Sequence, residues 1–465
     1  MRYDIYQQVY GLSLCSSGLS AYNGTEAELQ KTMEEWLPDA ITKRDIGIWE
    51  VVWGPVVWKN GLTVNDSESS ADHVWFVVKG TSTIDDQTSD TYVVAVAQAS
   101  MNSVYDRFYE SITVFPAVNF RRWVLGWKPH GIPKPRRSVP SQVYTPADEI
   151  YPIEYPALPL ADLLKQSPTD STPLDPLYES TPTARSLPMS SSYIAFGTAL
   201  GVRILLSAAS PCSAASPCKT LGQFLCTIPQ KARVIFTGHS LGGVLTPPLA
   251  LGCYAAGFLD NVNDGDIFTF PTAGPSPGDV RFKDQFSSVF PPRRGERYMN
   301  WNCNLWNAYD IVPYAFCTDT TRDQHIQRIP GLYGGEGPDV VQKFVRNLEK
   351  CANASGITYE PLPGVMFAGR KIDNSPKCPT GDEADNSSQD PTWMEVAEEE
   401  HKGEYYVYMN IFPPSQPKDA RPGKEIATRS ERKGPVEFET LIFGSKVVRA
   451  ARKAENGSST ASGST

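Results

Sequence analysis

The run Gly-His-Ser-Leu-Gly-Gly at residues 238–243 places Ser240 between small residues, where a strand is expected to meet a helix. A side chain on so sharp a turn projects from the carboxyl edge of a sheet, and glycines are needed because backbone crowds both sides. A serine there is suited to attack on a carbonyl carbon. A glycine-rich helix start that only packs closely is the alternative. The strand expected at 232–237 and the helix expected after the serine favour a nucleophile.

A serine hydroxyl needs a nearby base, and the base needs a third group that holds its tautomer. Histidine is the natural base, and the chain has five of them. His239 adjoins the serine, so its side chain should point away from that of Ser240. His73 and His130 precede the serine, which breaks the chain order of serine, acid and histidine. These arguments leave His325 and His401 as candidates.

The predicted acid is Asp310, within Asn-Ala-Tyr-Asp-Ile-Val-Pro at 307–313. A polar residue that opens an Ile-Val-Pro stretch after a strand suits a loop at the edge of a sheet. An ordinary turn or capping aspartate is the alternative. Asp266 begins a predicted strand and Asp279 follows a Pro-Gly turn, so both are weaker candidates.

Acyl transfer also requires donors aimed where negative charge develops on the carbonyl oxygen. The backbone N–H of Leu241, directly after the serine, supplies the first. Two segments, 79–82 and 97–100, are candidates for the second. The chain has no His-Glu-x-x-His run, no paired Cys-x-x-Cys spacing with histidines and no phosphate-binding glycine loop. We therefore expect neither a metal nor another cofactor.

The elements that would position these residues follow from apolar periodicity. Two helices are predicted within 3–37, and the polar run 81–90 is predicted to connect two strands. A buried helix is predicted at 193–209. The strands are predicted at 48–53, 74–78, 92–96, 232–237 and 266–270. A strand, helix and strand from 232 to 270 form a βαβ unit, which implies a mostly parallel sheet with helices on its faces.

The chain is predicted to form one α/β domain over 1–412, interrupted by a long proline-rich insertion at 116–190. Residues 413–465 are mixed in charge and end in small polar residues, so we expect a partly disordered extension. The net charge of −9 argues against a nucleic-acid partner and leaves small uncharged substrates as the better fit.

The amino terminus lacks the uninterrupted apolar stretch of an export signal, so an intracellular location is the default expectation. The run 193–209 carries Arg203 and two glycines, and therefore no transmembrane segment is predicted. Most of the nine cysteines are expected to be core thiols. Cys212 and Cys218 could pair across a small-residue loop, and sequons such as that at Asn23 leave the redox compartment open.

Several separated motifs between about residues 74 and 409 resemble the class 3 lipase family of α/β-hydrolases, especially its bacterial branch. They are the 238–243 run with Val-Leu-Thr-Pro-Pro-Leu-Ala-Leu after it, Thr-Ala-Gly-Pro-Ser-Pro-Gly at 272–278, the 307–313 motif and Ile-Ala-Phe-Gly-Thr-Ala-Leu-Gly at 194–201. The resemblance implies an α/β-hydrolase fold. It also implies a triad of Ser240, Asp310 and a later histidine. Family helices in which tyrosine follows histidine by a few residues favour His401 over His325.

The family's oxyanion strand usually ends in Arg-Gly-Ser/Thr and is followed by a short lid helix. Residues 79–81 look like that signature, but 105–109 resemble the helix that follows it, so we align Ala99 with the family's hydroxyl residue. Ala99 keeps a backbone donor and loses the side-chain hydroxyl, which lowers activity unless Ser100 substitutes. An apolar stripe at Val104, Phe108 and Ile112 fits either a lid or an ordinary core-facing helix.

The predicted activity is therefore the hydrolysis of carboxylic esters of lipids, by a triacylglycerol lipase or esterase, through an acyl-enzyme. Ser240 attacks, His401 moves the proton, Asp310 orients His401, and Leu241 and Ala99 donate to the oxyanion. The expected partner is a lipid or other ester substrate, with transient contact to a lipid interface through the lid. A phospholipase and a noncatalytic lipase-like binding or signalling protein are the alternatives.

Overall fold

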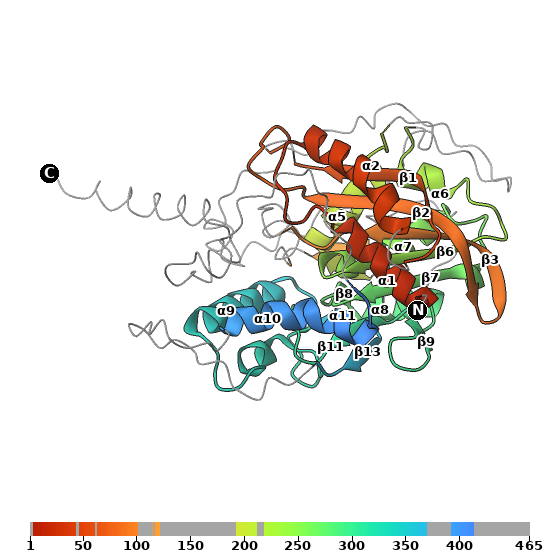
Figure 1. The fold of residues 1–465 in the computed structure, drawn as a ribbon. Helices are drawn as coiled ribbons and strands as arrows, with labels where there is room; N and C mark the ends of the chain where they lie inside the picture. Colours follow the sequence, from red (N-terminus) through yellow and green to blue (C-terminus); the bar gives the residue numbers. More distant parts are fainter. Residues whose placement is uncertain are drawn as a thin grey trace, which may run out of the picture.

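The computed structural model describes residues 3–42, 46–60, 63–100, 114, 117–120, 192–211, 218–369 and 392–412. A seven-stranded sheet lies at its centre, with strand order β1-β2-β3-β6-β7-β11-β13 (Figure 1). The strands are β1 Glu50–Trp58, β2 His73–Ile84, β3 Gln87–Val96, β6 Arg233–His239, β7 Ile267–Thr272, β11 Asn304–Asn307 and β13 Gly364–Phe367. From β3 to β13 all neighbours pair in parallel, whereas β2 pairs antiparallel with both β1 and β3. The predicted mostly parallel sheet is confirmed.

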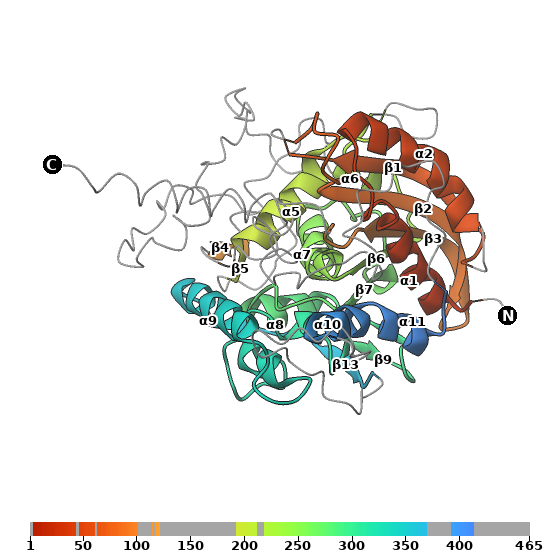
Figure 2. The same cartoon turned by 60° about the vertical axis from the view of Figure 1, so that its left-hand side comes forward.

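Helices cover both faces of the sheet, as Figure 2 shows. Neighbouring residues of β3 face opposite sides, so Val94 packs into one apolar cluster and Val93 into the other. The first cluster contains residues of α5 Phe196–Ser207, α6 Leu221–Leu225, α7 Leu241–Ala255 and α8 Val280–Val289. The second contains residues of α1 Ile5–Ser16, α2 Glu26–Thr42 and α11 Gly403–Met409. Apolar burial on both faces is the main stabilising contribution to such a sheet.

A third apolar cluster lies beside β11 and is built from helical segments. These are the 3-10 segments η3 Val312–Tyr314 and η4 Ile326–Gly331, and the helices α9 Asp339–Ala354 and α10 Trp393–His401. In Figure 1 α10 and α11 follow one another just above β11 and β13 in the view. Only Lys402 separates the two helices, and its φ of −126° and ψ of −61° depart from helical values. The end of α10 is therefore a sharp junction.

A second, four-stranded sheet has the order β12-β8-β5-β4. Its strands are β4 Ala117–Asn119, β5 Tyr193–Ala195, β8 Gly278–Asp279 and β12 Tyr359–Glu360. The helix predicted at 193–209 is wrong over its first three residues, because these form β5. Pairing of Ile194 with Gly278 and with Val118 decides the conformation of that segment. Such long-range pairing overrides a local apolar pattern.

The polar run 81–90 forms the predicted hairpin between two strands, but its turn is much shorter than the run. Both strands continue through it and turn only at Asp85 and Asp86, whose φ values are 51° and 60°. Two positive φ values in a two-residue connection match the twist of a hairpin. Hydroxyl groups pair across the strands, Ser82 with Thr91 at 2.6 Å and Thr83 with Thr88 at 2.8 Å. These residues are polar although they belong to strands.

Other predictions are only partly covered by the described residues. No helix among them is long and apolar enough to cross a membrane. The apolar stripe at 104–112, nearly all of the 116–190 insertion, and residues 413–465 lie outside them.

Cys218 is disulfide-bonded, but Cys212, its predicted partner, lies outside the described part. The free cysteines that are described are Cys15, Cys226, Cys253, Cys303, Cys317 and Cys351, and four of these are buried.

Candidate active site

Ser240 lies on the turn between β6 and α7, with φ 59° and ψ −117°. A non-glycine residue with positive φ is strained and persists only where its surroundings hold it. Two backbone hydrogen bonds do so here. The Ser240 N–H donates to the Thr272 carbonyl at 2.9 Å, and the Ser240 carbonyl accepts from the Val244 N–H at 3.1 Å.

Glycines on either side of Ser240 permit close approach of the backbone. A Cβ atom added to Gly242 would overlap the carbonyl of Val96 at the end of β3, and one added to Gly243 would overlap that of Thr272 at the end of β7. The turn is therefore wedged between the carboxyl ends of the two neighbouring strands. This is the local arrangement that the sequence motif predicts.

Asp310 lies three residues beyond β11, at the same edge of the sheet, and its side chain is completely buried. Its carboxylate accepts the Val312 N–H at 3.0 Å through Oδ1 and the Tyr405 hydroxyl at 2.8 Å through Oδ2. Both oxygens lie 2.9 Å from Nδ1 of His401. A buried carboxylate is costly unless donors satisfy it, and these three groups do so.

His401 is the last residue of α10, and its ring joins the acid to the serine. Nε2 lies 2.8 Å from Ser240 Oγ, on the other side of the ring from Asp310. An ionised carboxylate can only accept, so Nδ1 of a neutral His401 carries the proton and the Nε2 lone pair faces the serine hydroxyl. The structure thus brings Ser240, His401 and Asp310 into one hydrogen-bonded row.

The side chain of His239 points away from Ser240 and hydrogen-bonds to the backbone of His401. Its Nε2 lies 2.8 Å from the His401 carbonyl oxygen, and its Nδ1 lies 2.9 Å from Thr272 Oγ1. Burial, and then the neighbouring His401, lower the pKa of His239 well below its usual range. The ring is therefore neutral, Nε2–H donates to the carbonyl, and the Thr272 hydroxyl donates to Nδ1. The sequence predicted the direction of this side chain and missed its contact.

Tyr405 is a second residue that the sequence reasoning missed. It is fully buried, and burial, with the adjacent Asp310, raises the pKa of its hydroxyl well above the usual range. That hydroxyl donates to Asp310 and accepts the Asn307 N–H at 3.1 Å. Its place four residues after His401 was the available signal, but α11 is a separate helix, so spacing alone does not predict the contact.

The other candidate residues lie elsewhere. His325 precedes η4 and contacts Gln327 through Nδ1 at 2.9 Å. His73 begins β2, where its ring lies against two tryptophans, and His130 is outside the described residues. Asp266 precedes β7 at the opposite edge of the sheet from Ser240. Asp279 accepts the Phe282 N–H and caps α8, which is an ordinary structural role.

The two predicted oxyanion donors lie at the same edge of the sheet as Ser240. Leu241 is the first residue of α7, and the first amides of a helix have no carbonyl partner within it. Ala99 lies three residues beyond β3, whose last residue Val96 pairs with Gly238. The rival segment 79–82 pairs with the beginning of β3 instead. It therefore lies at the wrong edge of the sheet.

The backbone around Ala99 is anchored by the end of α1 and the turn after it. The Gln98 N–H donates to the Ser17 hydroxyl at 3.1 Å. Ser100 is buried, and its hydroxyl donates to the Ser20 carbonyl at 2.8 Å and also contacts the Ser70 hydroxyl. Because the Ser100 hydroxyl is engaged with those groups, its substitution for the missing oxyanion hydroxyl has no support here.

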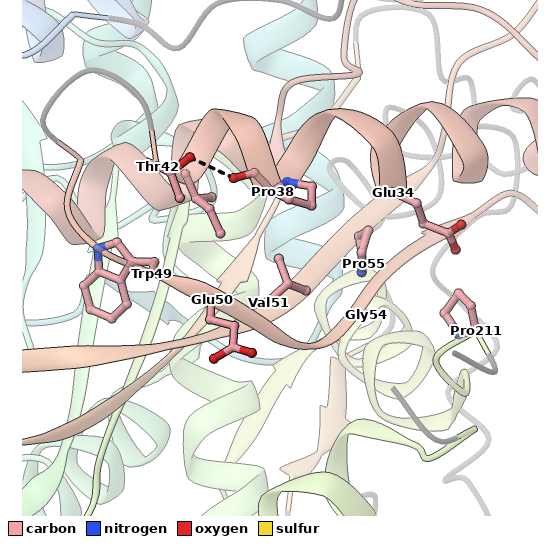
Figure 3. Close-up of a pocket in the computed structure, with 10 residues that line it drawn as sticks. Glu34, Pro38, Thr42, Trp49, Glu50, Val51, Gly54, Pro55 and Pro211 are labelled. Atoms are coloured by element: carbon pink, nitrogen blue, oxygen red, sulfur yellow. Dashed lines mark hydrogen bonds between the residues drawn. The ribbon is translucent and has the colours of Figure 1, made fainter. Parts of the chain in front are cut away.

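A cavity of about 410 Å³ lies away from these residues, between α2 and the edge strand β1. Figure 3 shows Pro38 and Thr42 of α2 above Val51 and Pro55 of β1. Its lining contains none of Ser240, His401 and Asp310. It is separate from the candidate active site.

Comparisons with known proteins place this architecture. No family model and no curated protein match the sequence. The crystal structure of M37 lipase matches with a TM-score of 0.54 and 20% identity, covering 88% of this chain and 94% of that chain. This chain has the α/β-hydrolase fold. The Rhizomucor miehei triacylglyceride lipase matches with a TM-score of 0.30 and 14% identity, covering 66% of this chain and 72% of that chain.

In α/β-hydrolases the nucleophile sits on a strand-to-helix turn and precedes the acid and the histidine along the chain. Ser240, Asp310 and His401 follow that order. The solved structure that matches with a TM-score of 0.54 is that of a lipase. Membership of the class 3 lipase family, and of its bacterial branch, stays a prediction.

The buried, neutral His239 predicts a pH dependence of stability. Its pKa in the folded state is depressed, whereas an unfolded histidine titrates at about 6.5. Above about pH 7 both states are neutral at this residue. As the pH falls below about 6.5, the unfolded state takes up a proton that the folded state does not, so the free energy of unfolding decreases.

A His239→Gln variant removes this proton uptake. We expect its free energy of unfolding to be below that of the wild type at about pH 7.5, and this difference to become smaller at about pH 5.5, by at most about 1.4 kcal/mol. Urea titrations at the two pH values measure the gap. A gap that is constant or that widens on acidification contradicts the assignment of a neutral, buried ring.

Proposed function

We propose that this chain is a serine hydrolase that cleaves carboxylic ester bonds of lipids. The observation that carries the proposal is the uninterrupted row from Ser240 Oγ through the His401 ring to the Asp310 carboxylate, with distances of 2.8 and 2.9 Å. This geometry lets one residue activate another without rearrangement. Catalytic roles follow for the three residues.

His401 Nε2 takes the Ser240 proton as Oγ attacks the ester carbonyl carbon. The imidazolium that forms is stabilised by the adjacent Asp310 carboxylate, and it then gives its proton to the departing alcohol oxygen. The acyl group stays on Ser240. Water, deprotonated in the same way by His401, attacks this acyl-enzyme. As the bond to Oγ breaks, His401 returns the proton to Oγ, which releases the acid and restores the serine.

The backbone N–H groups of Leu241 and Ala99 are proposed to donate to the oxyanion. Loss of one such donor in other enzymes slows the reaction by about two to three orders of magnitude. With alanine at position 99, no side-chain hydroxyl from this residue adds to the backbone donors. We therefore propose that the site relies on backbone donors, one from α7 and one from the segment that follows β3.

Lipid esters are the proposed substrate class. Support comes from the lipase fold match and from the motifs that resemble class 3 lipases. A noncatalytic lipase-like protein is less favoured. The buried Asp310 carboxylate and the strained backbone at Ser240 both cost stability, and a protein that only binds would not need this arrangement around His401. Perturbed and costly polar arrangements of this kind gather at functional sites.

Hydrolysis of p-nitrophenyl esters with short and long acyl chains tests the proposal. A Ser240→Ala variant is expected to lose at least about 10³-fold in kcat, because no other group can form the acyl-enzyme. Ser288→Ala, on the exposed side of α8, is the matched control and should keep the wild-type rate. Equal rates for Ser240→Ala and the wild type would rule out Ser240 as the nucleophile, and an inert wild type would favour the noncatalytic alternative.

The choice of base is tested separately. His401→Ala is expected to lower kcat by at least about 10³-fold, since the serine proton then has no acceptor. His325→Ala removes a histidine that contacts Gln327 instead, and it should leave kcat unchanged. Retained activity in His401→Ala, or loss of activity in His325→Ala, would overturn the assignment.

A further inference from the structure

The side-chain amide of Asn307 is completely engaged at the end of β11. It is buried, and its Nδ2 donates to the Glu400 carbonyl oxygen at 2.9 Å and to the Glu400 carboxylate at 2.6 Å. Its Oδ1 accepts the N–H groups of Tyr309 at 3.1 Å and Gly369 at 2.8 Å. An asparagine amide has two donor hydrogens and two acceptor lone pairs. All four are used, so the orientation of the amide is fixed.

The main chain at His401 is held from two sides. Asn307 holds the carbonyl of Glu400, and His239 holds the carbonyl of His401 itself. The last carbonyls of a helix have no partner within it, and α10 is only nine residues long. Side chains from the ends of β6 and β11 thus fix two successive carbonyls where α10 ends. The direction of the His401 ring depends on these peptide units.

The Glu400 side chain completes this arrangement. It is 2% exposed and occupies space that a side chain at position 369 would need, because a Cβ atom on Gly369 would overlap its carboxylate. The pKa of Glu400 is raised to about 7 in total, because burial, the largest cause, and the nearby Glu404 and Asp310 raise it by more than the Asn307 hydrogen bond lowers it. A buried acid is costly unless it is hydrogen-bonded. Asn307 provides that hydrogen bond.

We propose that Asn307 and Glu400 are positioning residues for His401. The Asn307 amide fixes the peptide unit that bears His401, and the Glu400 carboxyl group holds that amide in place through its Nδ2. Neither residue is expected to contact the ester. Their loss should therefore slow the chemical step and leave substrate binding unchanged. This proposal rests on the proposed hydrolase function.

The test measures kcat and KM separately on a p-nitrophenyl ester. Asn307→Ala and Glu400→Ala are expected to lower kcat at least about tenfold, which corresponds to about 1.4 kcal/mol, with KM within about twofold of the wild type. Glu400→Gln keeps an oxygen that can accept from Asn307 Nδ2, so it should stay within about twofold of wild-type kcat. Glu399→Ala, an exposed acid on the same helix, is the matched control.

Folding is separated from positioning by two further measures. Glu400→Asp shortens the side chain by one methylene and so moves the carboxyl group away from Asn307. If the alanine variants do not fold, the kcat of Glu400→Asp is compared with that of Glu400→Gln instead. The proton on His401 Nδ1, held against Asp310, is expected to give a strongly downfield proton NMR signal. That signal should persist in Glu400→Gln and shift or disappear in the alanine variants or in Glu400→Asp.

The outcomes separate this proposal from the proposed function. Because the NMR signal needs no turnover, it tests positioning even if the wild type hydrolyses no ester. The positioning proposal would be overturned if Asn307→Ala, Glu400→Ala and Glu400→Asp fold, keep the wild-type kcat and give an unchanged NMR signal. The proposed hydrolase function would not be affected by that result. The positioning proposal would also be overturned if Glu400→Gln lost as much kcat as Glu400→Ala or Glu400→Asp, because the hydrogen bond to Asn307 would then not be what matters.

Discussion

Asp310 is withdrawn from water, and the free-energy cost of burying its carboxylate is offset by donors from three places in the chain. Val312 donates from the turn that follows, Tyr405 from α11, and His401 from the end of α10. Each donor fixes a different element against the end of β11. The direction of the His401 ring, and with it the distance to Ser240, follows from satisfying this one buried charge.

The parallel sheet makes the arrangement possible. Because the carboxyl ends of parallel strands share one edge, β6, β7 and β11 deliver Ser240, Thr272 and Asp310 to the same place although they are far apart in sequence. The serine turn fits between its neighbours only because glycines flank it. Close packing at this edge also explains why His239, which follows β6 directly, reaches the backbone of His401.

Sequence reasoning succeeded where the signal was local. The glycine-flanked turn at Ser240 and the βαβ unit around it are written in consecutive residues, and Asp310 is found by the residues beside it. It failed in β5, where pairing with distant segments decides the conformation, and it overestimated the length of the connection in the 81–90 hairpin, whose strand residues are polar. Asn307, Glu400 and Tyr405 were missed because their importance lies in contacts across about a hundred residues of chain, which no spacing rule encodes.

His401 is proposed to activate Ser240 by taking the proton of its hydroxyl group. Labelling with a p-nitrophenyl alkylphosphonate, followed by peptide mass spectrometry, tests it most directly, because the reagent is attacked by an activated serine and forms a stable adduct. We expect a single adduct on the peptide that contains Ser240, and we expect this adduct to be lost in folded His401→Ala. An adduct on another residue, or equal labelling of Ser240 in the His401→Ala variant, would contradict this proposal.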